Sequence, residues 1–147
     1  MTDHALLSAL ERIAASLERM SPPPPSADIL HKHDAFLWQA ALGVLTPVEK
    51  VSGVPLSLLQ GVKRQMDQVM ANTRHFAEGF SANNVMLWGA RGMGKSSLVK
   101  ASVAAVNEEQ RAEGGGTLAL IEIQRDELAS LPKLLAVLRT TKRRCIL

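Results

Sequence analysis

The sequence predicts an α/β fold, with a parallel sheet of about three strands, flanking helices and a helical N-terminal region. Two short, continuous apolar runs, at 85–88 and 117–123, have the composition of strands that are buried on both faces. A segment with helical apolar spacing, 95–111, lies between them, and a third apolar run opens at Cys145. This alternation of strand and helix is typical of a parallel sheet covered by helices.

The composition is that of an ordinary globular protein. Of the 147 residues, 46% are hydrophobic and 21% charged, so we expect a packed core. A net charge of only +3 and an aromatic content of 3% disfavour nucleic acid as a partner. No apolar stretch is long enough to span a bilayer, and a single cysteine, Cys145, fits a reducing compartment. We therefore expect a cytoplasmic protein that does not bind membranes.

Region 1–20 is expected to form an amphipathic helix over 3–20, and region 21–26 is expected to be a linker. Apolar residues recur at alternating spacings of four and three, at Leu6, Leu10, Ile13, Leu17 and Met20. The stripe fits a coiled coil or packing against the rest of the chain, and the sequence favours neither. Four consecutive prolines give the linker an extended, semi-rigid conformation.

Region 27–80 is expected to be helical. A helix over 27–43 is predicted from an apolar face made of Ile29, Leu30, Phe36, Leu37, Ala40 and Ala41. A loop rich in Pro and Gly follows, and a further helix over 61–80 has Gly79 placed to end it.

Region 81–147 contains the motif that carries chemistry. The pattern glycine, four residues, glycine, lysine, serine is matched by Gly89-Ala90-Arg91-Gly92-Met93-Gly94-Lys95-Ser96. Glycines permit backbone angles that turn successive N–H groups toward a phosphate, and the following helix adds its unpaired N–H groups and positive dipole end. Lys95 is expected to reach the β and γ phosphates, Ser96 to bind Mg²⁺ and Ser97 to contact the α phosphate.

The position of this loop, between a predicted strand and a predicted helix, is the one that phosphate binding requires. We therefore expect a P-loop NTPase-type sheet that binds a purine nucleoside triphosphate together with Mg²⁺. A dinucleotide site fits worse, because its third small residue would fall on Ser97 and Lys95 would have no role. A helix over 126–140, interrupted near Pro132, completes this partial core.

The residues around the loop resemble an uncharacterised bacterial family of AAA-type ATPases. The resemblance rests on Asn83-Asn84 and the apolar run before the loop, and on Ser97-Leu98-Val99-Lys100 after it. It extends from about Phe36 and Trp38, through Leu58-Leu59-Gln60-Gly61-Val62 and Asn72-Thr73, to the end of the chain. In AAA-type proteins the loop before the first core helix lines the adenine pocket, and the resemblance therefore implies adenine contacts by Leu59, Gly61 and Val62. Lys63 departs from the acidic residue usual at its position.

The resemblance also implies a hydrolytic machinery that this sequence does not display. AAA-type ATPases carry an acidic pair at the end of the third strand, followed by a sensor residue, an arginine finger and a helical lid. The chain ends at Leu147, inside that strand, and Glu122 and Asp126 belong to the preceding strand and loop. We therefore expect a truncated chain with no catalytic residues, without hydrolysis and with an exposed apolar sheet edge.

Two functional hypotheses remain open. In the first, the chain is the ATP-binding N-terminal part of an AAA-type ATPase, which as an intact oligomer would remodel a client protein. In the second, it is a non-catalytic module that docks a protein or a nucleic acid through its N-terminal helix and basic surface. The nucleotide would then be a structural ligand only.

Overall fold

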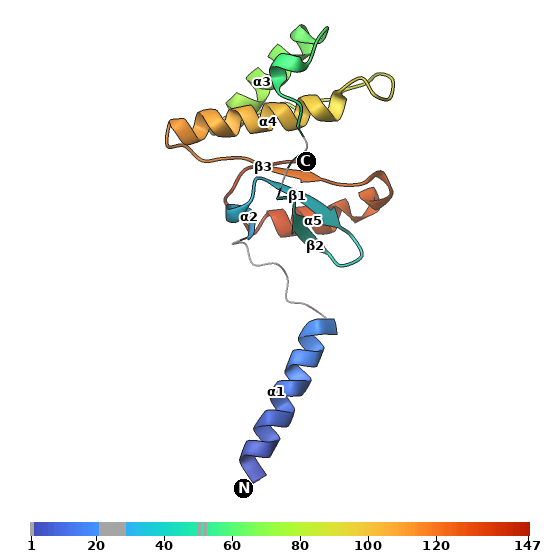
Figure 1. Cartoon of the computed structure of the whole chain (residues 1–147), viewed down its shortest axis with the longest axis vertical. Coiled ribbons are helices and arrows are strands. Elements are labelled where there is room, and N and C mark those ends of the chain that lie inside the picture. Colours follow the sequence, from blue (N-terminus) through green and yellow to red (C-terminus); the bar gives the residue numbers. More distant parts are fainter. Residues whose placement is uncertain (1, 21–28, 50, 52) are drawn as a thin grey trace.

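The structure is a computed structural model that describes residues 2–20, 29–49, 51 and 53–147. Helices lie on both faces of a four-stranded mixed sheet with the strand order β2-β1-β3-β4 (Figure 1). The strands are β1 (Ala35–Gln39), β2 (Val44–Pro47), β3 (Ala119–Glu122) and β4 (Cys145–Ile146). The helices are α1 (Thr2–Met20), α2 (Ile29–Lys32), α3 (Lys63–Ala77), α4 (Lys95–Ala112) and α5 (Leu131–Leu138), with 3₁₀ helices η1 (Leu56–Leu58) and η2 (Arg125–Ser130).

The sheet is mostly parallel, as the sequence predicts. β1 pairs in parallel with β3, and β3 pairs in parallel with β4. Only β2 is antiparallel, and it pairs with β1 across a tight turn. The α/β class is therefore confirmed, and β2 and β4 form the two edges of the sheet.

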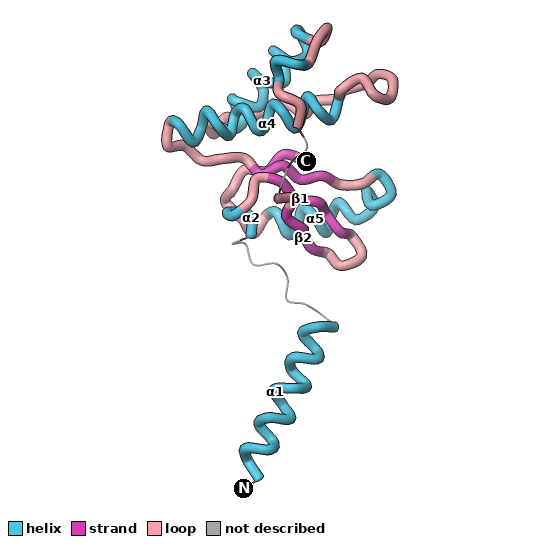
Figure 2. The backbone as a smooth tube through the Cα atoms, in the orientation of Figure 1, coloured by secondary structure: helices cyan, strands magenta, loops and turns pink. Residues whose placement is uncertain are grey.

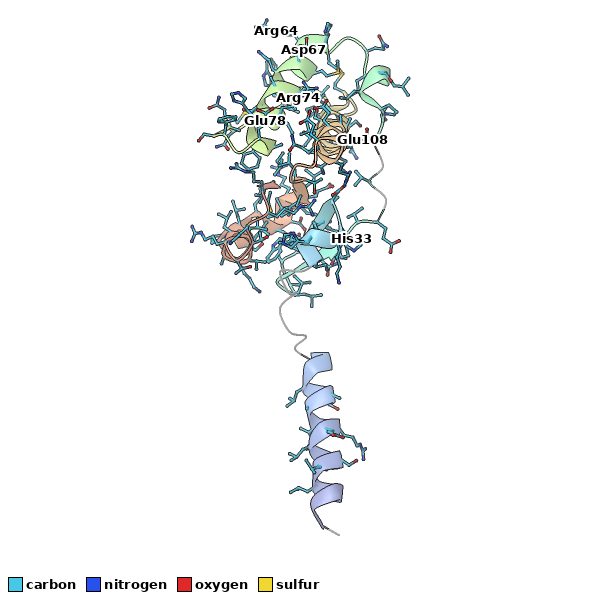
Figure 3. All side chains as sticks on the ribbon, turned by 90° about the vertical axis from the view of Figure 1, so that its left-hand side faces the viewer. His33, Arg64, Asp67, Arg74, Glu78 and Glu108 are labelled. Carbon is cyan, nitrogen blue, oxygen red and sulfur yellow. The ribbon has the colours of Figure 1, made fainter. Side chains whose placement is uncertain are left out.

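Two apolar cores lie on opposite faces of the sheet. The first joins the sheet to α5 through Leu30, Phe36, Trp38, Leu45, Ala119, Ile121 and Leu134. The second joins it to α3 and α4 through Ala35, Met70, Val103, Val106, Leu118 and Leu120. Arg74 of α3 also donates two hydrogen bonds of 2.7 Å to the Glu109 carboxylate of α4, and Figure 3 shows it between these two helices. The helix pair is thus fixed to one face of the sheet.

The direction of α4 determines at which end of the parallel strands its first residue lies. The buried Asn107 side chain, far along α4, exchanges hydrogen bonds of 2.9 and 2.7 Å with the backbone of Leu118, just before β3. Lys100, nearer the start of α4, reaches the Glu122 carboxylate at the end of β3, with an N–O distance of 2.9 Å. Therefore α4 runs antiparallel to β3, and its N-terminus lies toward the carboxyl ends of the parallel strands.

The helix predicted over 27–43 is wrong beyond its first residues. Residues 27 and 28 lie outside the described residues, α2 spans Ile29–Lys32, and the rest of the segment forms β1 and the turn that leads into β2. Phe36 and Trp38 are both buried, which is the period of two that a strand requires. Gly43 closes the turn with a φ of 68°, a conformation that favours glycine. Because β1 pairs with β3, residues on both sides of the expected boundary at 80/81 share one sheet.

The strand predicted over 85–88 is also wrong. This segment has no strand assignment, and Met86 and Trp88 are 86% and 88% exposed. Figure 2 shows it as loop, apart from the strands of the sheet. A cavity of about 280 Å³, lined by both 82–85 and 145–147, lies beside the outer edge of β4. The apolar run thus has strand composition, but its backbone does not pair with β4 or with any other strand among the described residues.

Most other elements match their predictions. α1, α3, α4 and β3 correspond to the segments predicted at 3–20, 61–80, 95–111 and 117–123. Where one interrupted helix was predicted over 126–140, η2 passes into α5, and Pro132 lies in the first turn of α5. The predicted linker over 21–26 lies outside the described residues. Within the described part of the chain, no helix is long and apolar enough to cross a membrane.

Candidate functional site

The glycine-rich segment 89–94 leads directly into α4. Gly89, Gly92 and Gly94 have φ angles of +143°, +84° and +77°, which side-chain-bearing residues rarely adopt. Gly94 is also the N-cap of α4, and its carbonyl accepts the first helical hydrogen bond, of 2.8 Å from Leu98 N. A Cβ built on Gly89 or Gly92 would meet no other atom within 4 Å. These two glycines are therefore required by the backbone path and not by crowding.

The loop is open to solvent. Ala90, Arg91 and Met93 are exposed, as is Ser96 on the first turn of α4, and Ser97 is half-buried. No acidic residue lies in the first turn of the helix, so the positive end of its dipole is not neutralised there. With Arg91 and Lys95 close in sequence, the arrangement suits an anion.

Lys95 folds back over the loop that precedes it. Its ammonium group donates hydrogen bonds of 2.9 Å to the Gly89 carbonyl and 2.6 Å to the Ala90 carbonyl. Neither acceptor is a carboxylate, and an ammonium has a third N–H to offer. Its position shows that the lysine is held over the loop by weak neutral acceptors, which a polyanion would outcompete.

One of the three residues that the resemblance assigns to the adenine base lies beside the loop. A Cβ built on Gly94 would be 3.7 Å from Leu59 Cδ2, so the Leu59 side chain reaches the start of α4. Gly61 is exposed, and a Cβ on it would meet no other atom within 4 Å. Val62 is half-buried at the N-cap of α3. The structure brings Leu59 to the loop, whereas the environment of Gly61 shows no such approach.

A side chain that the sequence did not single out as functional fixes the approach to the loop. Asn72 of α3 donates a hydrogen bond of 2.8 Å to the Asn83 carbonyl and accepts one of 2.9 Å from the Asn83 N–H. The Asn72 side chain thus bonds both the N–H and the carbonyl of Asn83, as the backbone of a neighbouring strand would. Both residues stand out in the sequence only as part of the family resemblance, which gives them no role.

A second cationic group lies at the opposite, amino-terminal edge of β3 and β4. The Arg143 side chain is only 6% exposed. Its guanidinium donates to the carbonyls of Leu30, His33, Thr117 and Leu118, to the Thr117 hydroxyl and to the Asp34 carboxylate. All of its donors are thereby satisfied inside the protein. Nothing in the sequence marked this network, because its partners are far apart along the chain.

Asp34 accepts hydrogen bonds from Arg143 and also from Arg111 of α4. Burial by itself would raise the pKa of Asp34, but the hydrogen bonds and charges of the two arginines outweigh it, and the pKa lies below its usual value. Burial raises the pKa of the neighbouring Cys145 thiol, against a smaller opposite effect of Arg143. The cysteine is therefore a protonated packing residue.

A metal ion at the loop would depend on the nucleotide for most of its ligands. The described residues contain no group of three or more His, Cys, Asp or Glu side chains that is placed to hold a metal. Ser96 is exposed at the start of α4, where a hydroxyl is available as a single ligand. The arrangement therefore fits a magnesium ion that arrives bound to phosphate, and does not fit a resident metal.

Comparison with curated proteins found no match, and neither did comparison with solved structures. A family match covers residues 31–147, which include the whole sheet and the glycine-rich loop. All of α1, the predicted linker and the first two residues of α2 precede it. The chain therefore belongs to the family described as "Protein of unknown function (DUF815)".

Proposed function

We propose that the chain binds the triphosphate of ATP, together with Mg²⁺, in the loop 89–96. The observation that carries this proposal is the backbone of the loop. Three glycines with positive φ angles form a solvent-open turn at the start of an 18-residue helix, and Lys95 lies over that turn. The loop also lies toward the carboxyl edge of the parallel strands, where open α/β sheets usually bind ligands.

Each residue of the loop has a defined role in this proposal. Backbone N–H groups from Arg91 to Ser97 surround the phosphates, and Gly89, Ala90, Gly92, Met93 and Gly94 provide the path that lets them do so. Lys95 exchanges its two carbonyl acceptors for β and γ phosphate oxygens. Ser96 binds Mg²⁺ through its hydroxyl, and Ser97 donates to the α phosphate.

The proposed base site lies on the η1 side of the loop. Leu59 supports it, because its side chain already reaches Gly94. Gly61 and Val62 are included only by the family resemblance. A preference for ATP over GTP rests on the same resemblance.

The proposal is tested by the affinity of Lys95→Ala for Mg-ATP and for adenosine, measured by titration calorimetry. A charge-assisted hydrogen bond contributes about 1.5–3 kcal/mol, so the variant should bind Mg-ATP about ten- to a hundredfold more weakly. Its affinity for adenosine should be unchanged. Lys142→Ala, an exposed lysine at the opposite edge of the sheet, is the matched control and should behave as the parent. Equal Mg-ATP affinities for parent and Lys95→Ala would refute the site.

In the larger setting that we propose, this chain is the N-terminal part of an AAA-type ATPase that acts in the cytoplasm on a protein client as a homo-oligomer. The competing function is a docking module in which the nucleotide is only structural. Its support is the amount of exposed apolar surface, on α1 and at Met86 and Trp88. Steady-state phosphate release can separate the two. Release that Lys95→Ala abolishes would show hydrolysis and rule out the docking module, whereas tight Mg-ATP binding without release is expected both of a docking module and of an ATPase part that lacks the acidic pair.

A further inference from the structure

α1 has an apolar face without a partner in the structure. Leu6, Leu7, Leu10, Ile13 and Leu17 are each more than half exposed. Figures 1 and 3 show α1 apart from the α/β core, and neither apolar core contains an α1 residue. Of the two readings that the sequence left open, packing against the rest of the chain therefore receives no support from the structure.

The apolar residues of α1 follow a heptad. Leu10 and Leu17 occupy the a positions, and Leu6 and Ile13 the d positions. The flanking e and g positions carry no charge, since they are Leu7, Ala9, Ala14 and Ser16. Leucine at a with isoleucine at one d position, together with small or apolar flanks, gives a face wider than a two-stranded seam needs.

From Leu6 onward the charged residues of α1 lie in two separate lines behind this face, whereas Asp3, in the first turn, falls at an a position. Glu11 is at a b position, beyond the e side of the seam, and Arg12 is at a c position, beyond the g side. The same pair recurs seven residues later in the sequence, at Glu18 and Arg19. One edge of the helix is therefore acidic and the other basic. In a parallel bundle the e side of each helix faces the g side of its neighbour, so that the acidic edge meets the basic one. In an antiparallel pair, like edges would meet.

We propose that α1 forms a parallel, in-register bundle with α1 of other copies of this chain, and that the bundle contains more than two helices. The a/d residues and the flanks form its interior, and the opposite edges fix its orientation. A membrane surface is the weaker alternative, because surface-bound helices usually carry a basic polar face, whereas here Glu11 and Glu18 balance Arg12 and Arg19. The proposal does not depend on nucleotide binding by the loop.

The first test is sedimentation equilibrium of the full chain over a range of concentrations. The parent should associate into species larger than a dimer. The double variant Leu10→Glu, Ile13→Glu should be monomeric, because it places charges in the interior of the bundle. Ala15→Glu, at an f position on the opposite side of α1, should associate as the parent does. Unchanged thermal unfolding of the α/β core would show that the double variant is folded, and association in Lys95→Ala separates this proposal from nucleotide binding.

The second test is orientation, by disulfide formation in a Cys145→Ser background. Leu6→Cys should cross-link with itself under mild oxidation, because a parallel bundle brings residue 6 of neighbouring copies together. Cross-linking only in a mixture of Leu6→Cys and Leu17→Cys proteins would show antiparallel pairing and overturn the proposal. A parent that is monomeric at every concentration would also overturn the proposal. The same holds for a monomer in which Leu10 and Ile13 are needed only for binding to phosphatidylserine vesicles.

Discussion

At each of the two ends of the parallel strands, a cationic side chain is held against backbone carbonyls. The two ends differ in whether that side chain keeps a hydrogen-bond donor free. At the amino-terminal edge Arg143 is 6% exposed, and its donors are all bonded within the protein. At the carboxyl edge Lys95 has two carbonyl acceptors and lies over a loop that is open to solvent. Positive charge alone therefore does not mark a binding site in this fold. We propose that hydrogen-bond donors left unsatisfied, as at Lys95, mark it instead.

The largest effect that this comparison predicts is the loss of stability in Arg143→Ala. The substitution removes a buried donor from four carbonyls and from the Asp34 carboxylate, although Asp34 keeps Arg111 and the Leu118 carbonyl keeps Asn107, and the lost hydrogen bonds should together cost about 3 kcal/mol or more. Urea unfolding followed by circular dichroism measures it. Arg143→Lys should rescue little of the loss, because an ammonium cannot reproduce the planar fork. If Arg143→Ala instead unfolds like the parent but binds Mg-ATP more weakly, the roles of the two edges are reversed.

For Gly92→Ala in the open loop we expect the opposite of Arg143→Ala, namely weaker Mg-ATP binding with little loss of stability. The effect is also smaller. A φ of +84° is strained for alanine by about 1–2 kcal/mol, although there is room for the added methyl group. Relaxation of this strain should reshape the loop and weaken Mg-ATP binding about tenfold, with little change in global stability because the loop is exposed. Gly116→Ala is the control, since that glycine also has open space and its φ is not positive. Parent-like affinity in Gly92→Ala would mean that the loop conformation does not matter for binding.

The network of Asp34 and Arg143, at the amino-terminal ends of β3 and β4, should also make the stability of the protein depend on pH. Because the pKa of Asp34 is lowered in the folded protein, its contribution to stability is present above the unfolded-state pKa and is lost as pH falls through the folded-state value. Asp34→Asn should therefore be less stable than the parent at pH 7, and the difference should shrink below about pH 4. Thermal unfolding across this range measures it. A difference that stays constant down to pH 2 would show that the loss is steric and not ionic.

The smallest effect is expected for Asn72→Ala, which releases the chain segment before the loop. Two exposed hydrogen bonds to Asn83 are lost, at a cost of about 1 kcal/mol. Hydrogen exchange at the Asn83 amide should accelerate, and Mg-ATP affinity should fall severalfold or less. Asn84→Ala, the neighbouring amide side chain, should leave both unchanged. Equal exchange rates at Asn83 in the two variants would remove Asn72 from the account.

The sequence predicted those parts of the fold whose signal is local. α3 and α4 were found from apolar spacing and from the glycines at their ends, and the glycine-rich loop was found from its pattern alone. The hairpin β1–β2 was missed, because Ala40 and Ala41 extend the apolar residues of 27–43 into a helix-like pattern, whereas Phe36 and Trp38 follow the strand period. The apolar run at 85–88 was predicted as a buried strand because it has the composition of one. Composition does not show whether the segment pairs with another strand.

Features made by distant residues were not predictable. Asp34 and Arg143 are 109 residues apart, and neither stands in a motif. Asn72 and Asn83 are closer, but an amide that imitates a strand partner has no distinctive spacing. At the loop, the pattern predicted a glycine-rich turn at the start of a helix, whereas the hydrogen bonds from Lys95 to the Gly89 and Ala90 carbonyls are visible only in the structure.

The central claim is that the main-chain amides of the loop capture the triphosphate, and amide NMR spectra recorded during titration with Mg-ATP test it most directly. We expect large shifts of the amide signals from Arg91 to Ser97, small shifts around Leu59 and none at Thr117 or Arg143, with adenosine leaving the Arg91 to Ser97 signals in place. Saturable binding of Mg-ATP that shifts the signals of Thr117 and Arg143 and leaves those of the loop unmoved would contradict the account.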